Sequence, residues 1–476
     1  MTLLFTHQDM AQITGGHWAA GHMPVQSPSH LAINSKELGP SGCFVALKGT
    51  KSDGHDFVVD LEADKHQMAL TSQLVAGATV PQLVVEDVLE ALTALARFAA
   101  QQTKAVKIAI TGSAGKTGTK EILATGLSAF GKTYATKGNL NNHIGLPLTL
   151  ANLPADSQFC VAEMGMNHAG EIRALSQIFQ PDIAIITTIS AAHIGHFDGL
   201  SGIADAKAEI FEGFDKKGLA ILPRDNAFFE HLKKLAVEHG ATQILSFGEN
   251  ETSDIRLVDA RPDQTGQSLV LSIADASLNG RLGMTARHWA VNSLSFMAVC
   301  HHLGLDRQAG LDALSEMQDM PGRGRRATYK TNSHLCMLID DAYNANPESM
   351  MAALSELGRQ TGGHKGAILS DILELGSFAD EAHSALKTEI EQAGITHLIA
   401  IGPYMTSLAQ TLDKAMSVQC FENWRDALSS AQDMLKQANV ILIKGSHGSG
   451  AHHIAADLLA IAQKTSTRSG GEPHVA

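Results

Sequence analysis

An apolar run, a glycine-rich turn and a helical segment follow one another in AVKIAITGSAGKTGTKEILATGL, residues 105–127. A fully apolar run of this length is typical of a strand that is buried on both faces of a parallel sheet. A glycine-rich turn between such a strand and a helix directs backbone N–H groups toward a bound phosphate. The stretch therefore predicts an α/β fold that carries a phosphate-binding loop.

The residue pattern of this loop predicts a role for most of its residues. Lys116 is expected to reach the β- and γ-phosphates of a nucleotide, and the Thr117 hydroxyl to bind Mg²⁺. A standard P-loop has glycine six residues before the lysine, but position 110 is isoleucine, so the pattern is the shorter GxxGKT. The alternative is an ordinary βα turn with a chance lysine, and the apolar strand before the loop argues against it. The backbone that would face the phosphate belongs to Gly112, Ser113, Ala114 and Gly115.

Further apolar runs alternate with helical segments and end in polar loops. The central series is FCVAEMG, DIAIITTIS and LAILPRDN, and a second series from about residue 330 is LCMLIDDAYN, GAILSDILELG, THLIAIGP and NVILIKGSHG. This alternation predicts doubly wound parallel sheets. Because ligands of such sheets lie at the carboxyl ends of the strands, the residues just after each run are the ones expected to act.

Three domains are the expected organisation of the 476 residues. Residues 1–103 mix short apolar runs with turn signals and end in a predicted helix, QLVVEDVLEALTALARFAAQQ. The central domain is expected at 104–327 and a C-terminal α/β domain at 328–465. Residues 466–476 are rich in turn formers and lack an apolar period, so we expect a disordered tail there.

Composition narrows the class of protein. A formal net charge of −13 disfavours a nucleic-acid partner, although one helix N-terminus with a lysine can still bind an anion. No window approaches eighteen uninterrupted apolar residues, and the N-terminus lacks a basic region before an apolar run, so neither a membrane span nor a signal peptide is expected. The five cysteines are scattered singly, which indicates reduced thiols and a cytoplasmic protein.

Two further strand ends carry residues that suit a metal site beside Thr117. Glu163 closes FCVAEMG, and His193 follows DIAIITTIS. A carboxylate at that edge can hold Mg²⁺, whereas imidazole is an uncommon ligand of this ion. Each residue alone has a plainer interpretation, Glu163 as a solvated strand end and His193 as a loop histidine. Three metal-competent residues at three strand ends favour the site.

Lys207 lies on the apolar face of the helical segment GIADAKAEIFEGF, together with Ile203, Ile210, Phe211 and Phe214. A lysine among apolar groups has a lowered pKa, and its neutral amine can capture CO₂ to give a carbamate, an anionic ligand for a second Mg²⁺. The alternative is a lysine whose stem is buried while its ammonium reaches water. On position alone, that alternative is the stronger one.

These motifs resemble the Mur ligases, ATP-dependent amide-bond-forming enzymes of peptidoglycan synthesis. TGSAGKTGTK is similar to the family's TGTxGKTT loop, with Ser113 for threonine and Gly118 for threonine or serine. Over roughly residues 30–450, six segments resemble the branch of the family that adds D-Ala-D-Ala. They are KGNLNNHIGLPLTL, AEMGMNHAGEI, AHIGHFDGLSGIADAKAEIF, IDDAYNANPESM, LELG and IKGSHG. The resemblance implies a UDP-binding N-terminal domain, a central ATPase domain, and a Rossmann-like C-terminal domain that receives the dipeptide.

The resemblance also implies roles for single residues. Thr117 and Glu163 would bind one Mg²⁺, while His193 and carbamylated Lys207 would bind a second, with Glu163 shared; this raises the carbamate above its alternative. The ATP site would comprise Lys116 and the loop from Gly112 to Gly118, Asn292 at the adenine, Arg323 at the phosphates and Asp341 at the ribose. The substrate residues would be Ser35, Asp53 and His55 at the uridine nucleotide, Asn141 and Asn142 near the muramoyl group, and Tyr343, Asn344 and Asn346 at the dipeptide.

The implied reaction joins D-Ala-D-Ala to UDP-N-acetylmuramoyl-tripeptide through an acyl phosphate, with Lys116, Glu163, His193 and Lys207 as the catalytic set. A monomer that acts on small molecules is expected. Within the family, the motif DDAYNANP and the lack of a DNPR-type segment argue against the tripeptide-forming branch. Cyanophycin-type ligases and folylpolyglutamate synthase are the other near rivals within the family.

Three positions depart from the family pattern. Gly118 lacks a hydroxyl, Trp289 replaces the first asparagine of an HNxxN segment, and His447 replaces the arginine of KGSR. These departures favour a non-catalytic UDP-sugar-binding protein with a decayed ATPase. The intact Lys116 and Glu163 argue against decay. A P-loop hydrolase that turns over ATP without an amino-acid acceptor is the other alternative.

Overall fold

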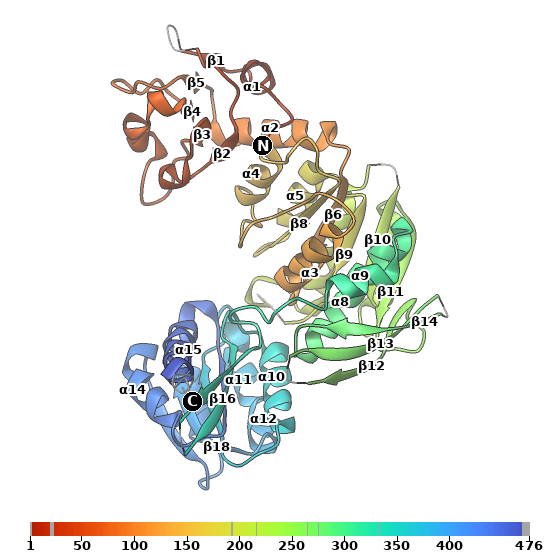
Figure 1. Ribbon diagram of the computed structural model, residues 1–476, viewed down its shortest axis with the longest axis vertical. Coiled ribbons are helices and arrows are strands. Elements are labelled where there is room, and N and C mark those ends of the chain that lie inside the picture. Colours follow the sequence, from red (N-terminus) through yellow and green to blue (C-terminus); the bar gives the residue numbers. More distant parts are fainter. Residues whose placement is uncertain are drawn as a thin grey trace, which may run out of the picture.

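The computed structural model describes residues 2–19, 23–191, 194–215, 217–263, 265–274, 276–331 and 333–468. These residues form three sheets, each in its own part of the sequence. Figure 1 shows the three parts in a row, with the N-terminal part (red) at the top and the C-terminal part (blue) at the bottom. The predicted α/β class with three parts is confirmed.

The N-terminal sheet has five strands in the order β1-β5-β4-β3-β2. Strands β2 to β5 run parallel and β1 runs antiparallel to β5, so the carboxyl ends of β2, β3 and β4 meet at one edge. The strands are β1 (His17–Trp18), β2 (His30–Ala32), β3 (Gly42–Val45), β4 (Met68–Thr71) and β5 (Gln82–Val84).

Helix α1 (His7–Thr14) precedes the N-terminal sheet, and α2 (Val88–Gln102) leads from it to the central sheet. The helix predicted over residues 82–102 therefore begins only at Val88, because its first residues pair with β4 as strand β5. Asp87 starts the helix there by accepting the N–H groups of Leu89 and Glu90.

The central sheet has nine strands in the order β14-β13-β12-β11-β10-β9-β6-β8-β7. Its parallel part runs from β7 to β12, whereas β13 and β14 continue it as antiparallel strands that the sequence did not lead us to expect. The strands are β6 (Val106–Thr111), β7 (Thr133–Ala135), β8 (Phe159–Glu163), β9 (Ile183–Ile186), β10 (Gly218–Pro223), β11 (Ala241–Gly248), β12 (Ile255–Pro262), β13 (Gln267–Ile273) and β14 (Ala276–Leu282).

Helices cover both faces of the central sheet, as expected of a doubly wound fold. One apolar cluster joins Ile108 and Ile110 of β6 to residues of α3 (Lys116–Ser128), α8 (Arg287–Leu303) and α9 (Arg307–Ala313). The other joins Ala109 to helices on the opposite face: α4 (Gly145–Ala151), α5 (Glu171–Phe179), α6 (Leu200–Ala208) and α7 (Phe229–Glu238). Successive residues of β6 thus face opposite cores.

The C-terminal sheet has six strands in the order β15-β16-β20-β17-β18-β19, all parallel except β15. The strands are β15 (Arg325–Lys330), β16 (Leu335–Asp341), β17 (Lys365–Ser370), β18 (Ile395–Ile401), β19 (Ser417–Phe421) and β20 (Val440–Lys444). The helices are α10 (Pro347–Arg359), α11 (Ala379–Ser384), α12 (Lys387–Gln392), α13 (Pro403–Ala409), α14 (Trp424–Met434) and α15 (Ala451–Arg468).

Two expected boundaries need correction. Strand β15 starts at Arg325 and pairs with β16, so a domain boundary after residue 327 falls inside a strand. We propose the division before Gly322, whose N–H donates to Asp340 of β16. Helix α15 continues to Arg468, so residues 466–468 are helical, while 469–476 lie outside the described residues. Within this last part of the helix, the Thr465 hydroxyl donates to the carbonyls of Ile461 and Ala462.

Among the described residues, no helix combines the length and the apolar character that crossing a membrane requires.

Candidate active site

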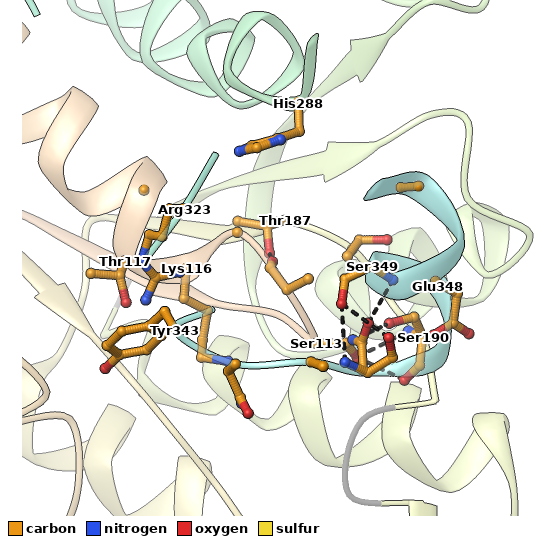
Figure 2. Close-up of a pocket in the computed structure, with 18 of the residues that line it drawn as sticks. Ser113, Lys116, Thr117, Thr187, Ser190, His288, Arg323, Tyr343, Glu348 and Ser349 are labelled. Atoms are coloured by element: carbon orange, nitrogen blue, oxygen red, sulfur yellow. Dashed lines mark hydrogen bonds between the residues drawn. The ribbon is translucent and has the colours of Figure 1, made fainter. Parts of the chain in front are cut away.

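A cleft of about 1220 Å³ lies between the central and C-terminal sheets. Most of the predicted site residues line it, and they come from both sides (Figure 2). The central side supplies Ser113 to Gly118, Asn141, Asn142, Glu163 and Asn292, and the C-terminal side supplies Arg323, Asp341, Tyr343, Asn344 and Asn346. His193 lies outside the described residues, and Ser35, Asp53 and His55 belong to the separate N-terminal sheet.

The phosphate loop is shaped by two glycines and closed by its lysine. Gly112 has φ +152°, and a Cβ there would lie 1.8 Å from Oγ1 of Thr187, so no side chain fits. Gly115 has φ +82° and precedes the first residue of α3, Lys116. The Lys116 ammonium folds back and donates to the Gly112 carbonyl over 2.7 Å. Burial lowers the pKa of Lys116, and the Glu163 carboxylate opposes that shift.

The absence of a side chain at Gly118 has a steric cause. A Cβ at this position would lie 2.2 Å from Cζ3 of Trp289, which is 1% exposed. The indole of Trp289 therefore fills the space that threonine or serine would occupy. The two departures from the family pattern, at positions 118 and 289, compensate each other.

Asn292 of α8 lies against the phosphate loop. Its amide Oδ1 is 3.1 Å from the position that a Cβ of Gly115 would take. One turn earlier on the helix, His288 opens to the same cleft. Desolvation by the surrounding cleft lowers the pKa of His288, although the residue is exposed there, and the Asp341 carboxylate opposes the shift.

Glu163 ends β8 and is 2% exposed. Its Oε1 accepts a hydrogen bond from Nδ2 of Asn141 at 2.8 Å, whereas its Oε2 is buried without a hydrogen-bond partner among the described residues. A buried carboxylate oxygen without a partner is costly unless a ligand completes it. Asn142 acts differently, because its Oδ1 accepts the N–H groups of Ile144 and Gly145 at the start of α4.

The donor set suits Mg²⁺ that is shared with phosphates. The orphaned oxygen of Glu163 and the Thr117 hydroxyl both lie in the cleft, and both are oxygen ligands. Within the described part of the chain, no group of three or more His, Cys, Asp or Glu residues could hold a metal ion. Mg²⁺ at this place would therefore take further oxygens from nucleotide phosphates and water, as it commonly does.

Lys207 is buried, as its position on the apolar face predicted. It is 2% exposed in α6, so the alternative of an ammonium that reaches water is wrong. Burial places the pKa of Lys207 well below its ordinary value, and the positive charge of Lys116 lowers it further. Burial thus favours the neutral form of the Lys207 amine, which lies within electrostatic range of Lys116 in the phosphate loop.

The C-terminal side of the cleft presents an arginine and an aspartate. The Arg323 guanidinium lies 4.1 Å from the centre of the Tyr343 ring, an arrangement that holds both side chains. Asp341 accepts a hydrogen bond from Nζ of Lys444 through Oδ2 at 2.7 Å. The sequence motif IKGSHG contains Lys444, but its pairing with Asp341 was not predicted. The position of Lys444 at the end of a strand, β20, could have indicated that it reaches the cleft.

Asn344 and His447 hold each other next to Tyr343. The backbone N–H of His447 donates to Oδ1 of Asn344 at 3.3 Å, and its Nδ1 lies 3.2 Å from the Tyr343 carbonyl. The ring of His447 also stacks on His452 at 4.3 Å between centroids. Replacing the family's arginine therefore leaves an ordered, exposed imidazole at the cleft.

Asn346 has a structural task that differs from the predicted contact with the dipeptide. It is 7% exposed and caps α10, because its Oδ1 accepts the Ser349 N–H at 2.8 Å. Its Nδ2 donates to Oγ of Ser190 at 3.2 Å. Both ends of the amide are therefore engaged within the protein, and a contact with substrate would use the second N–H or the second lone pair.

A hydrogen-bonded chain crosses the cleft on one side (Figure 2). The Ser113 hydroxyl donates to the Ser190 carbonyl and accepts the Ser190 N–H, each at 2.9 Å. Oε1 of Glu348, on α10, accepts the Ala191 N–H at 3.1 Å. Sequence reasoning missed Ser190 and Glu348, although Ser190 follows the apolar run that forms β9.

Ser35, Asp53 and His55 lie at the carboxyl edge of the N-terminal sheet, after β2 and β3. Nδ1 of His55 is 2.6 Å from Oδ1 of Asp53, and its Nε2 accepts the Ser72 N–H at 2.9 Å. Ser72 was not predicted, but it directly follows β4 and could have been found from that position. Together these residues form a polar edge that suits a nucleotide.

Comparison with known families covers most of the chain. A family described as "Mur ligase middle domain" matches residues 110–300, and "Mur ligase, glutamate ligase domain" matches residues 324–447. A Rickettsia prowazekii protein named UDP-N-acetylmuramoyl-tripeptide--D-alanyl-D-alanine ligase is 32% identical over 421 residues, 88% of this chain and 93% of its own. The Escherichia coli protein of the same name is also 32% identical, over 89% and 92% of the two chains.

Solved structures agree in overall fold. A crystal structure of MurF from Acinetobacter baumannii matches with a TM-score of 0.85 and 32% identity, covering 97% of this chain and all (100%) of that one. MurF ligase from Thermotoga maritima, solved in complex with ADP, matches with a TM-score of 0.75 and 25% identity, over 91% and 98% of the chains. The chain belongs to the Mur ligase family.

Proposed function

We propose that this protein is an ATP-dependent ligase that joins D-Ala-D-Ala to UDP-N-acetylmuramoyl-tripeptide during peptidoglycan precursor synthesis. The observation that carries the proposal is the cleft, where a phosphate loop on one side faces Arg323 and Asp341 on the other. Relatives that bear the name of this reaction align over nearly the whole chain. The partners are small molecules, and we expect a cytoplasmic monomer.

In the first step the terminal carboxylate of the tripeptide attacks the γ-phosphate of ATP, which gives an acyl phosphate and ADP. Both reactants are anions, so Lys116 and Arg323 lower the repulsion between them. Thr117 and Glu163 would hold Mg²⁺, which neutralises phosphate charge when bound. Glu163 can do so without losing its bond to Asn141, because only Oε2 lacks a partner.

In the second step the amine of D-Ala-D-Ala attacks the acyl carbon, a proton leaves the amine, and inorganic phosphate departs. Tyr343 and Asn344 lie where the C-terminal side meets the cleft, so we assign them to the dipeptide. For the nucleotide we assign the loop from Gly112 to Gly118, Asn292 at the adenine and Asp341 at the ribose. For the other substrate we assign Asn141 and Asn142, with Ser35, Asp53 and His55 at the uridine nucleotide.

We further propose that Lys207 carries a carbamate and, with His193 and Glu163, serves a second Mg²⁺. Its buried amine lies close enough to Lys116 for the two charges to interact, so an anion on Lys207 would be stabilised there. Protein equilibrated with ¹³C-labelled CO₂ should show one carbamate signal that Lys207→Met removes. Lack of a signal in the unaltered protein, with and without Mg²⁺, would contradict the modification but not the ligase.

Phosphate release tests the function as a whole. With ATP, Mg²⁺ and UDP-N-acetylmuramoyl-tripeptide, release should be slow, and D-Ala-D-Ala should raise it strongly while one amide bond forms for each phosphate. Lys116→Met should abolish both. Equal release with and without the dipeptide would indicate a hydrolase, and no release in either case would indicate a decayed binding protein.

A further inference from the structure

Lys120 is a buried cation to which the proposed reaction gives no task. It lies on α3, one turn after Lys116, and is 1% exposed. A buried ammonium is strongly destabilising unless hydrogen bonds and opposite charges surround it. Its partners therefore indicate what the side chain is for.

The partners of Lys120 belong mainly to another segment. Nζ donates to the Thr136 carbonyl at 2.7 Å and to the Gly138 carbonyl at 3.3 Å. Its charge is balanced by Oε1 of the neighbouring Glu121 at 2.8 Å, whose side chain is 42% exposed. The ammonium thus ties the helix of the phosphate loop to the segment that follows β7.

That segment, residues 136–142, leads straight into the cleft. The Thr136 hydroxyl accepts the Glu163 N–H at 3.3 Å. Further on, Asn141 donates to Oε1 of Glu163, and its carbonyl accepts the Gly165 N–H at 2.9 Å. The segment 136–142 consequently holds both the backbone and the carboxylate of Glu163.

We propose that Lys120 is a positioning residue that fixes the segment 136–142 against α3 and, through Asn141, orients the Glu163 carboxylate beside Thr117. The tether is independent of the reaction, but its consequence for the metal rests on the proposed function. One ammonium thereby sets the distance between the two oxygen ligands, Thr117 in the first turn of α3 and Glu163 at the end of β8.

Replacing Lys120 with methionine tests the tether without any ligand. Lys120→Met has a similar side-chain length but removes the donor of the Thr136 carbonyl, on a residue that is 2% exposed, and of the carbonyl of the exposed Gly138. Hydrogen exchange of peptides covering 136–145 should rise about tenfold or more, while exchange in β6 stays the same. Lys132→Met is the matched control, because this exposed lysine lies just before β7 and pairs only with Asp156 at the surface.

Binding of ADP measured by calorimetry tests the consequence. Without Mg²⁺, Lys120→Met should bind ADP within about threefold of the unaltered protein, because Lys116 is intact. The Mg²⁺ concentration that strengthens ADP binding should rise about 10–100-fold, as is typical when a partner of a metal ligand is lost. Asn141→Ala should give the same shift, and the double variant no more than either single variant.

Several outcomes would overturn the inference. The first is unchanged hydrogen exchange at residues 136–145 in Lys120→Met. The second is an unchanged Mg²⁺ concentration for strengthened ADP binding. The third is a double variant whose Mg²⁺ shift equals the two single shifts combined. Should Lys120→Met not fold, Lys120→Gln keeps one donor and replaces it in every measurement; failure of both to fold would mark Lys120 as a core residue only. If the proposed ligase reaction fails while the exchange and ADP shifts occur, the tether stands and the reaction does not.

Discussion

Gly118 and Trp289 form a steric pair, although a residue-by-residue comparison with the family counts each as a departure. The glycine leaves room for an indole that is almost completely buried. Loss of a hydroxyl at position 118 is therefore a packing consequence, and it does not indicate decay of the phosphate loop. The Thr117 hydroxyl, which would serve Mg²⁺, lies in the cleft regardless of the neighbouring residue.

Exchanging both members of this pair should show the compensation. Gly118→Thr should lower the free energy of unfolding by about 1–3 kcal/mol, because the new side chain overlaps the indole. Trp289→Asn should cost about 3–5 kcal/mol through the cavity that it leaves. The double variant should lose less free energy of unfolding than the sum of the two single losses. Urea unfolding of the unaltered protein and the three variants measures these losses. Strict additivity would mean that the two residues do not share space.

The cysteines should differ in reactivity according to their burial. Burial raises the pKa of Cys43, Cys160, Cys300 and Cys336 to about 12, while Cys420 is exposed on β19. At pH 8 a thiol with such a pKa is only about 0.01% thiolate. In the folded protein we expect one thiol to react rapidly with a disulfide reagent, and in folded Cys420→Ser none. In urea, all five thiols of the unaltered protein should react. A second rapid thiol would show that a buried site opens.

At the scale of elements, helix α2 depends on its first turn. Oδ1 of Asp87 accepts two N–H groups, from Leu89 at 2.7 Å and Glu90 at 2.9 Å. Asp87→Ala should therefore lower the free energy of unfolding by about 1 kcal/mol. Glu86→Ala removes the adjacent exposed carboxylate and should change it by less than about 0.5 kcal/mol in a parallel urea experiment. Equal effects would assign the loss to charge and not to capping.

The parallel strands could be predicted because each is a short apolar run that is buried on both faces, as in β6 and β8. The antiparallel strands β13 and β14 escaped prediction for the opposite reason. In β13 every second residue is buried, and its first buried residue is the polar Gln267, which donates to two carbonyls. A strand with one solvent-facing side and a polar first residue is much harder to recognise from its sequence pattern.

The same contrast holds for the site. Glu163 could be predicted because it directly ends an apolar run. The bond between Ser190 and Asn346 could not, because its partners are 156 residues apart and meet only when two domains dock. Helical periodicity placed Lys207 on an apolar face but, by itself, favoured an ammonium that reaches water, and only the structure shows that the side chain is buried. The tether of Lys120 depends on where a distant segment passes. Local pattern reveals which residues face a core, but not which segments meet.

At the scale of the whole molecule, a short segment links the phosphate loop to the C-terminal domain. Residues 188–191 follow β9, and they contact Ser113 on one side and α10 on the other. Asn346 and Glu348, both at the start of α10, supply the contacts from the C-terminal domain. The two sides of the cleft are therefore held together beside the loop that would bind ATP. A substitution in this segment should therefore alter both how firmly the two domains are docked and the rate of the proposed reaction.

Glu348→Ala should loosen this link. It removes the acceptor of the Ala191 N–H, a hydrogen bond to a charged group worth about 1.5–3 kcal/mol, so the population of docked domains should fall. We expect a larger radius of gyration in X-ray scattering and about a tenfold lower kcat/KM, because the C-terminal residues would meet the nucleotide less often. Glu391→Ala is the matched control, since this carboxylate pairs with Lys387 within α12. If both variants change the radius equally, or if neither does, the contact at Ala191 does not hold the domains together.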